Sequence, residues 1–242
     1  MPVDALMYSG EIVPLEYVRP GDELMSPYST PRRVESVERM WGPLYGVRPA
    51  KGAAYVATML SVRESRRKFR TQTVSGAEWL AATPNFRQRH VGWRVAVDFL
   101  PGVSLADAYE VGARRKPLPH AYRVASRADR LQVLAGMMDA GGHQAAYAGY
   151  DFRAQCDRVM DDAVFLARSL GFAAYPSGSG RCHIAGEVGR IPCRRAHKRS
   201  YRKHEYRRVL HTGLRVYPLG KGEWVRLGVG EYVAGDFTVR VS

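Results

Sequence analysis

The sequence has little cysteine. Cys156, Cys182 and Cys193 are the only three in 242 residues, and a sparse, odd set is typical of reduced thiols rather than of a disulfide framework. Cys182-His183 with Cys193 is a weak match to a structural zinc site, because no Cys-x-x-Cys pair is present. The three residues are therefore interpreted as ordinary thiols.

Long apolar runs are also absent. No stretch approaches the ~20 apolar residues that a membrane helix requires. The opening segment "MPVDALMYSGEIVP" lacks the basic region and the following apolar run of a signal peptide. The sequence therefore predicts a soluble, intracellular protein of the cytoplasm or nucleus, with no membrane partner.

Acidic residues are in short supply. The chain has 23 Asp and Glu against 37 Lys and Arg, a formal net charge of +14, and its pI is near 10.0. A balance of this kind points to a polyanionic partner, usually nucleic acid, with a merely basic surface as the alternative.

The positive charge is concentrated in three clusters, "RESRRKFR" (63–70), "FRQRHVGWR" (86–94) and "RRAHKRSYRKHEYRR" (194–208). Aromatic residues lie within or beside all three, which suits phosphate contacts combined with stacking. For the third cluster, a solvated linker is the alternative. The expected contacts to double-stranded DNA are Arg66, Arg67, Lys68, Arg70, Arg87, Arg89, Arg94, Arg194, Arg195, Lys198, Arg199, Arg202, Lys203, Arg207 and Arg208.

The hydrophobic pattern changes twice along the chain. Residues 5–62 alternate in short strands broken by Ser-Gly, Pro-Gly-Asp and Ser-Pro, and strands return from residue 209 to the end. Between them, residues 63–101 are basic and mixed, with a short helix predicted at "SGAEWLAAT", and residues 103–120 form a connector rich in proline and arginine.

Two helices are predicted in the middle of the chain. Ser126 begins the first, with Asp129 as its capping-box partner, and apolar residues recur at helical spacing from Leu131 to Met138 before Gly141-Gly142 ends it. The second covers about residues 153–170. A helical block inserted into an all-β module would give this order, because such a module needs both chain ends to close its sheets.

Four segments together resemble a known architecture. "LMYSGEIVPLEYVRPGDELMSPYSTPRRV" (6–34) and "LHTGLRVYPLGKGEWVRLGVGEYVAGDFTV" (210–239) resemble the first and closing blocks of an intein (Hint) splicing module. "YRVASRADRLQVLAGMMDAGG" and "DDAVFLARSLGFAAY" are similar to the second LAGLIDADG helix of a DOD-type homing endonuclease and the helix that follows it.

The resemblance implies an α+β fold with a mainly-β Hint-like (intein) module formed from both chain ends, residues 1–62 and 209–242. Residues 63–102 would form a basic segment similar to a DNA-recognition region. Residues 103–208 would be an inserted half LAGLIDADG α+β nuclease-like domain whose first motif is truncated.

In this family two motif helices pack together and each delivers a carboxylate to a metal site over DNA. Ala135-Gly136 supplies the small patch that such packing requires. Laid against L-A-G-L-I-D-A-D-G, residues 134–142 are L-A-G-M-M-D-A-G-G, so Asp139 matches the sixth letter and Gly141 replaces the metal-binding acid. Asp139 is then the remaining candidate for a catalytic, metal-binding carboxylate, and Mg²⁺ is the cofactor if any nuclease activity survives.

The first copy of the motif is incomplete. "SLADAYEVGARRKP" (104–117) keeps Asp107, Tyr109 and Gly112 in step with the family pattern, and then its acidic end is missing. Single-motif relatives rebuild a two-helix centre by homodimerising. The resemblance therefore also implies a homodimer through the Leu134–Gly142 helix.

The splicing residues are missing as well. The N-terminal Cys or Ser nucleophile that an acyl shift requires would fall before Met1. The Thr-x-x-His block corresponds to "AYVATMLSVR", which has Thr58 but no His, and the terminal His-Asn corresponds to Val241-Ser242. Asp236 is interpreted as a retained family residue.

Three functions follow as hypotheses. The first is an intein-derived, DOD-type (LAGLIDADG) homing-endonuclease-like protein that binds double-stranded DNA, does not splice and is impaired in cleavage. The second is an active, Mg²⁺-dependent endonuclease whose homodimer would cut near-palindromic DNA. The third is a non-catalytic Hint-fold remnant. Basic clusters that converge on one face beside the Ala135-Gly136 helix would favour binding.

Overall fold

The structure is a computed structural model that describes residues 4–65, 70–100, 104–145, 149–177, 180–199 and 209–242. It is a mixed α+β fold, 27% helix and 39% strand, built from several small antiparallel sheets. The chain forms two compact units, Met1–Val95 with His211–Ser242, and Ala96–Leu210. No helix in the described ranges is long and apolar enough to cross a membrane.

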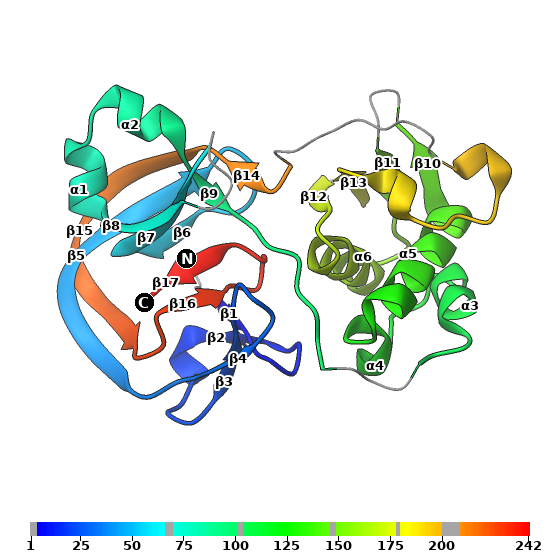
Figure 1. Ribbon diagram of the computed structural model, residues 1–242, viewed down its shortest axis with the longest axis horizontal. Helices are drawn as coiled ribbons and strands as arrows, with labels where there is room; N and C mark the ends of the chain where they lie inside the picture. Colours follow the sequence, from blue (N-terminus) through cyan, green and yellow to red (C-terminus); the bar gives the residue numbers. More distant parts are fainter. Residues whose placement is uncertain (1–3, 66–69, 101–103, 146–148, 178–179, 200–208) are drawn as a thin grey trace. The chain divides into compact units, whose positions relative to one another are not determined.

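Unit 1 is built around a pair of long strands from opposite ends of the chain (Figure 1). β5 (Val37–Pro49) pairs antiparallel with β15 (Leu214–Leu227), from Val37 opposite Leu227 to Pro49 opposite Leu214, and β6 (Tyr55–Ala57) adds to β5. The N-terminal and C-terminal segments are therefore parts of one sheet, as expected for a module closed by both chain ends.

A second sheet of unit 1 has the strand order β14-β9-β7-β8. These strands are β7 (Met59–Glu64), β8 (Thr71–Ser75), β9 (His90–Trp93) and β14 (His211–Thr212). Trp93 of β9 lies opposite His211 of β14. The chain thus leaves unit 1 and returns to it at neighbouring positions.

The remaining elements of unit 1 are short. The three hairpins join β1 (Asp4–Leu6) to β2 (Ile12–Pro14), β3 (Glu23–Met25) to β4 (Pro31–Arg33), and β16 (Glu231–Val233) to β17 (Val239–Val241). A single 3-10 turn (Leu15–Tyr17) and the helices α1 (Gly76–Ala81) and α2 (Pro84–Arg89) complete it. The helix expected at "SGAEWLAAT" is confirmed as α1, which Ser75 caps.

The observed division of the chain differs from the expected one at residues 63–102. Residues 63–95 belong to unit 1, because β7, β8 and β9 pair with one another in its sheet, and the rest of the segment belongs to unit 2. The sequence prediction treats the segment as separate because of its basic composition. Backbone pairing, however, decides which unit a strand joins.

Unit 2 is an alternation of helices and hairpins. α3 (Ala108–Ala113) and α4 (His120–Arg123) precede α5 (Arg127–Gly141). The hairpin β10 (Gly142–Gln144) and β11 (Tyr150–Arg153) comes next, then α6 (Asp157–Ser169), and then the hairpin β12 (Ala173–Ser177) and β13 (Arg181–Ala185). The strands form one antiparallel sheet of order β10-β11-β13-β12. Two 3-10 turns, η2 (Val188–Arg190) and η3 (Ala196–Lys198), follow it.

The two predicted helices of this unit are found, with one correction. α5 begins after Ser126, whose Oγ accepts a hydrogen bond from the Asp129 backbone N at 3.1 Å, and it ends at Gly141 as expected. α6 begins only at Asp157, because residues 150–153 are the strand β11. The helical pattern of apolar residues had been extended too far toward the N-terminus.

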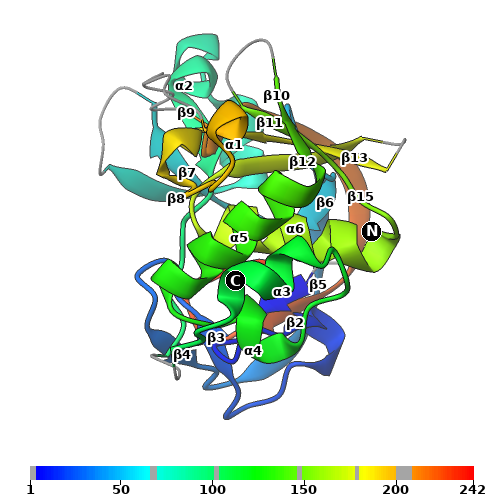
Figure 2. The same ribbon diagram turned by 90° about the vertical axis from the view of Figure 1, so that its right-hand side faces the viewer.

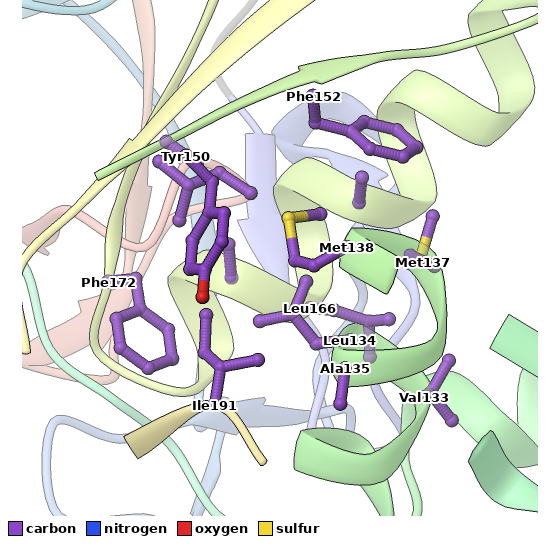
Figure 3. Packing of buried hydrophobic residues seen from close by; sticks show 14 of the residues in the cluster. Val133, Leu134, Ala135, Met137, Met138, Tyr150, Phe152, Leu166, Phe172 and Ile191 are labelled. Carbon is purple, nitrogen blue, oxygen red and sulfur yellow. The ribbon is translucent and has the colours of Figure 1, made fainter. Parts of the chain in front are cut away.

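The core of unit 2 lies between the helices and one face of the sheet (Figure 3). Tyr150 and Phe152 point from β11 toward Leu134 and Met138 of α5, and Leu166 of α6 packs in the same cluster. Alternate strand residues face the core, so the residues between them lie on the opposite face of the sheet. That second face is exposed.

Candidate nucleic-acid interface

Helices α3 and α5 lie against each other with their backbones in contact (Figure 2). A Cβ atom at Gly136 would lie 2.1 Å from the Tyr109 carbonyl oxygen, and one at Gly112 would lie 2.0 Å from the Val133 carbonyl oxygen. No side chain fits at such distances, so glycine is required at both positions. The small patch expected at Ala135-Gly136 is a helix-packing surface, and its partner is α3 of the same chain.

This pairing bears on the expected homodimer. Ala135 is fully buried, and the space beside Gly136 is filled by the backbone of Tyr109 and Ala113. A second copy of the chain could use the Leu134–Gly142 helix only by displacing α3. Helix α3 thus occupies the face of α5 that the second copy of a homodimer would need.

Asp139 is buried, with 1% of its surface exposed. Its Oδ2 accepts hydrogen bonds from the Tyr109 hydroxyl at 2.8 Å, the Arg194 backbone N at 2.6 Å and the Arg195 backbone N at 3.3 Å. Burial, together with the hydrogen bond to Asp139, raises the pKa of Tyr109 to about 12. The carboxylate therefore joins α3, α5 and the 194–195 segment.

The residues around Asp139 do not fit a divalent metal. Mg²⁺ binds through carboxylates and water in octahedral geometry, whereas one Asp139 oxygen is already bound by three N–H or O–H donors. Within the described ranges, no group of three or more His, Cys, Asp or Glu side chains could hold a metal ion. The only atom left for a ligand, Oδ1, is itself buried.

Gly141, which the LAGLIDADG resemblance would align with a metal-binding acid, is covered by an arginine. A Cβ atom at Gly141 would lie 2.7 Å from Arg115 Nε and 2.9 Å from its Cζ. Arg115 has φ 52°, in the left-handed region that few side chains adopt, and its Nη2 donates to the Arg153 carbonyl oxygen at 2.5 Å. A guanidinium thus lies where the family pattern places a carboxylate.

The first part of the third basic cluster folds onto the end of α5. Lys198 Nζ donates to the carbonyl oxygens of Asp139 at 2.7 Å and Met138 at 3.3 Å, which satisfies the free carbonyls of a helix C-terminus with a cation. Arg194 pairs with Glu110 at 2.8 Å, and its guanidinium lies 3.5 Å from the centroid of the Tyr109 ring. The described part of this cluster is therefore packed structure, not a solvated linker.

The same segment still presents charge to solvent. Arg194, Arg195 and Arg199 are exposed, although Arg199 Nε also donates to the Cys193 carbonyl oxygen at 3.0 Å. Burial lowers the pKa of Lys198, and the neighbouring positive charge of Arg195 lowers it further.

The exposed face of the unit 2 sheet carries residues that the sequence analysis did not single out. His143, Asp151, Arg153, Arg181 and His183 alternate with the buried residues of β10, β11 and β13, and all five are exposed. Arg153 lies directly opposite Arg181, and no ion pair joins either to an acid of the described chain. His183 Nδ1 lies 2.8 Å from Asp151 Oδ1.

A cavity of about 300 Å³ opens among these residues, lined by His143, Asp151, Phe152, Arg153 and Arg181. The period-two alternation in "YDFR" and "RCHIA" was the available signal. It was too short to be recognised beside the stronger helical pattern that follows residue 153.

The expected DNA contacts in unit 1 differ in their exposure to solvent. Arg70, Arg87 and Arg89 are exposed, as a contact requires. Arg94 is 3% exposed: its Nη2 lies 3.4 Å from Asp236 Oδ2 and donates to the Lys51 carbonyl oxygen at 3.2 Å. The prediction of Arg94 as a DNA contact is wrong, because its guanidinium is buried and interacts with Asp236 inside unit 1. The remaining expected contacts, Arg66, Arg67, Lys68, Arg202, Lys203, Arg207 and Arg208, lie outside the described residues.

Positions in two of the blocks that the intein resemblance would assign to splicing line one cavity of unit 1. Thr58, Ser61 and Ser242 are among the residues that line a space of about 380 Å³. Ser61, where the Thr-x-x-His pattern would place histidine, donates to Glu231 Oε1 at 2.6 Å and accepts from Trp93 Nε1 at 3.1 Å. A buried serine in such a network offers no base for activating a peptide bond.

Asp236 is part of the structural framework of unit 1. Arg94 Nη2 lies 3.4 Å from its Oδ2, and Arg240 Nη2 lies 3.7 Å from its Oδ1. Burial alone would raise the pKa of Asp236, but Arg240, Arg94 and the hydrogen bonds from Thr238 outweigh it and lower that pKa. The carboxylate thus balances two buried guanidinium groups.

No protein-family model and no curated protein sequence matches this chain at a significant level.

Proposed function

We propose that the protein is an intein-derived, LAGLIDADG-type protein that binds double-stranded DNA, does not splice and does not cleave. The observation that carries DNA binding is the exposed face of the unit 2 sheet, where Arg153 and Arg181 lie opposite each other without acidic partners. The proposal also assigns the two units: unit 1 is the Hint-like module, and unit 2 is the half LAGLIDADG domain.

Two features support the family. Gly112 and Gly136 are the glycines of the first and second motif copies, and the helices that carry them cross with backbone contact at both. In unit 1, segments from both chain ends pair as β5 and β15, and the positions of the splicing residues line one cavity. The chain order of these segments and the contacts between them both support the proposed family.

The charge on the sheet supports a polyanionic ligand. Like charges directly opposite each other on neighbouring strands are destabilising unless something neutralises them. A row of DNA phosphates would do so, and the overall charge of +14 would steer the protein to it. Asp151 and the two histidines beside the arginines are side chains that can hydrogen-bond to base edges.

The contacts at the C-terminal end of the α3–α5 helix pair support the proposed absence of cleavage. Asp139 is committed to three hydrogen bonds, and Arg115 covers Gly141. An active homodimer would need the Gly136 face that α3 occupies. These contacts oppose the second hypothesis, and the unpaired arginines oppose a remnant without binding.

The test is a salt-titrated binding assay on mixed-sequence duplex DNA, with and without Mg²⁺, read for both binding and nicking. We expect binding with a steep salt dependence and intact DNA. The double variant Arg153→Ala/Arg181→Ala should reduce the salt slope by about two, because each phosphate contact contributes about one.

The matched control is Arg158→Ala/Arg190→Ala, which removes the same charge from exposed positions of unit 2 outside the sheet. Equal affinities and slopes for the two double variants would refute the sheet face as the DNA-binding surface. Metal-dependent nicking by the unmodified protein would refute the loss of cleavage.

A further inference from the structure

The C-terminal end of the α3–α5 helix pair holds more positive charge than its carboxylates balance. Arg115, Arg194, Arg195 and Lys198 meet there, and the acids beside them are Asp139 and Glu110. Arg194 is paired with Glu110, while Asp139 is buried and bound through main-chain N–H groups and the Tyr109 hydroxyl. Among the described residues, no carboxylate forms an ion pair with Arg115, Arg195 or Lys198, although the charge of Asp139 acts on Lys198.

Lys198 lies close enough to Arg195 and Arg115 for their charges to act on it. Burial lowers the pKa of Lys198 most, the positive charges of Arg195 and Arg115 lower it further, and the carboxylate of Asp139 acts in the opposite direction. Lys198 Nζ is fixed on the last carbonyl oxygens of α5, and Arg115 is fixed through Nη2 on the Arg153 carbonyl oxygen. The cluster is thus held together by the fold despite its charge, which favours an anion as a further ligand.

Arg115 is placed by an unusual backbone. Its φ of 52° is a conformation that costs a residue with a side chain about 1 kcal/mol or more, and Gly141 leaves the space that its guanidinium fills. Its Nε is buried and makes no hydrogen bond to a described residue. A left-handed residue directly after the C-cap is a common helix ending, and here it directs the Arg115 guanidinium toward the end of α5.

We propose that Arg115 and Arg195, beside Lys198, bind a DNA phosphodiester at the place where the related nucleases hold metal ions, so that duplex binding needs no divalent metal. This proposal rests on the proposed function. Arg115 is bound to the backbone of Arg153, which lies opposite Arg181. The cluster therefore contacts the strand that carries Arg153, and the proposal is that one duplex contacts both.

Guanidinium groups suit this task, because their planar donors can match two phosphate oxygens at once, and Arg195 is exposed. Magnesium would then act only as a competing counterion, which weakens protein–DNA binding. A metal-dependent site would show the opposite, since Mg²⁺ would strengthen binding there.

The experiment is fluorescence anisotropy with a labelled mixed-sequence duplex, in EDTA and in Mg²⁺ at constant monovalent salt. The variant Arg115→Asn/Arg195→Gln removes both charges, and asparagine tolerates the left-handed backbone at residue 115. We expect equal or tighter binding of the unmodified protein in EDTA. The variant should lose about tenfold in affinity or more and about two in salt slope.

Arg195→Gln alone serves as a second variant, because its exposed side chain can change without disturbing the fold, and Arg158→Gln is the matched control. Affinity equal to that of Arg158→Gln, or tighter binding in Mg²⁺ than in EDTA, would overturn this proposal. If Arg153→Ala/Arg181→Ala then still loses binding, the proposed function stands without it. If the unmodified protein binds no duplex, both proposals fail.

Discussion

Asp139 occupies a position in which a carboxylate joins three segments of the chain. Its Oδ2 binds Tyr109 from α3 and the backbone of Arg194 and Arg195 from beyond the sheet. An acid in a nuclease-like motif can therefore be retained for folding alone. An aspartate at this position of the motif is therefore not evidence of catalysis by itself.

Asp139→Asn should destabilise the protein by ~1–3 kcal/mol, because an amide accepts these hydrogen bonds more weakly than a carboxylate and brings an N–H₂ group into a buried site. Urea unfolding measures the change, with Asp151→Asn, on the exposed sheet, as the control. Unchanged stability combined with a loss of Mg²⁺ binding would instead make Asp139 a metal ligand.

Gly141→Asp should not create a metal site. Its Cβ would meet Arg115 at 2.7 Å, so the new carboxylate would pair with that guanidinium. We expect calorimetry to detect no Mg²⁺ binding and anisotropy to show weaker DNA binding than in the unmodified protein. A stoichiometric Mg²⁺ site in the single variant would contradict this expectation.

Among the elements, α3 and α5 depend on each other through two glycines. Gly136→Ala would place a methyl group 2.1 Å from the Tyr109 carbonyl oxygen. The helices would have to separate, at a cost of about 1–3 kcal/mol or more. Thermal unfolding measures this, and Gly213→Ala is the control because no atom lies within 4 Å of its Cβ position. Equal melting temperatures for the two variants would show that α3 is not tightly packed.

Elements with strong local signals could be predicted from the sequence. α5 begins at a serine that caps it and ends at paired glycines, and α1 likewise follows a capping serine. The strands β10 to β13 lacked such signals, because they are short and only alternate residues are apolar. Their pairing is decided by contacts with α5 and α6, which no local pattern records.

The candidate site was predictable only in part, for the same reason. The motif comparison identified Gly136, Asp139 and Gly141. It could not show that Arg194, 55 positions further along the chain, would bind Asp139, nor that Arg94 would be drawn into an ion pair with Asp236. Distant partners decide whether a charged residue is available for a ligand.

For the molecule as a whole, two tyrosines predict loss of stability at alkaline pH. Burial raises the pKa of Tyr55 and of Tyr109 to about 12 each, above the ordinary tyrosine pKa of about 10. Between these pH values the unfolded chain has released protons that the folded protein keeps, so the free energy of unfolding falls as pH rises. Below pH ~10 tyrosine is protonated in the folded and the unfolded chain, so the two tyrosines cause no loss of stability there.

Urea unfolding across the alkaline range should therefore show a decline that is smaller in Tyr109→Phe. Absorbance of the folded protein should show that Tyr55 and Tyr109 are among the tyrosines that ionise later than an exposed tyrosine. A decline of the same size in the variant would exclude Tyr109 as a contributor.

The two units should also be separable. Because Trp93 lies opposite His211, a short Asn-Gly turn can replace residues 96–210 and leave β9 and β14 paired as a hairpin. We expect the shortened chain to unfold cooperatively in urea. Residues 1–95 alone should not, since β5 would lose its partner β15. If the shortened chain and residues 1–95 both folded, or both failed to fold, the result would contradict the division into units.

The pairing of β5 with β15 also sets an order of events during synthesis. Strand β5 is made early, but its partner begins at Leu214, after all of unit 2 has been translated. Unit 2 is continuous in sequence and can fold first, while the exposed edge of β5 waits for the closing strands. Until β15 is made, the unpaired edge of β5 is open to pairing with other chains, so we expect the N-terminal part to be the segment most prone to aggregation during synthesis.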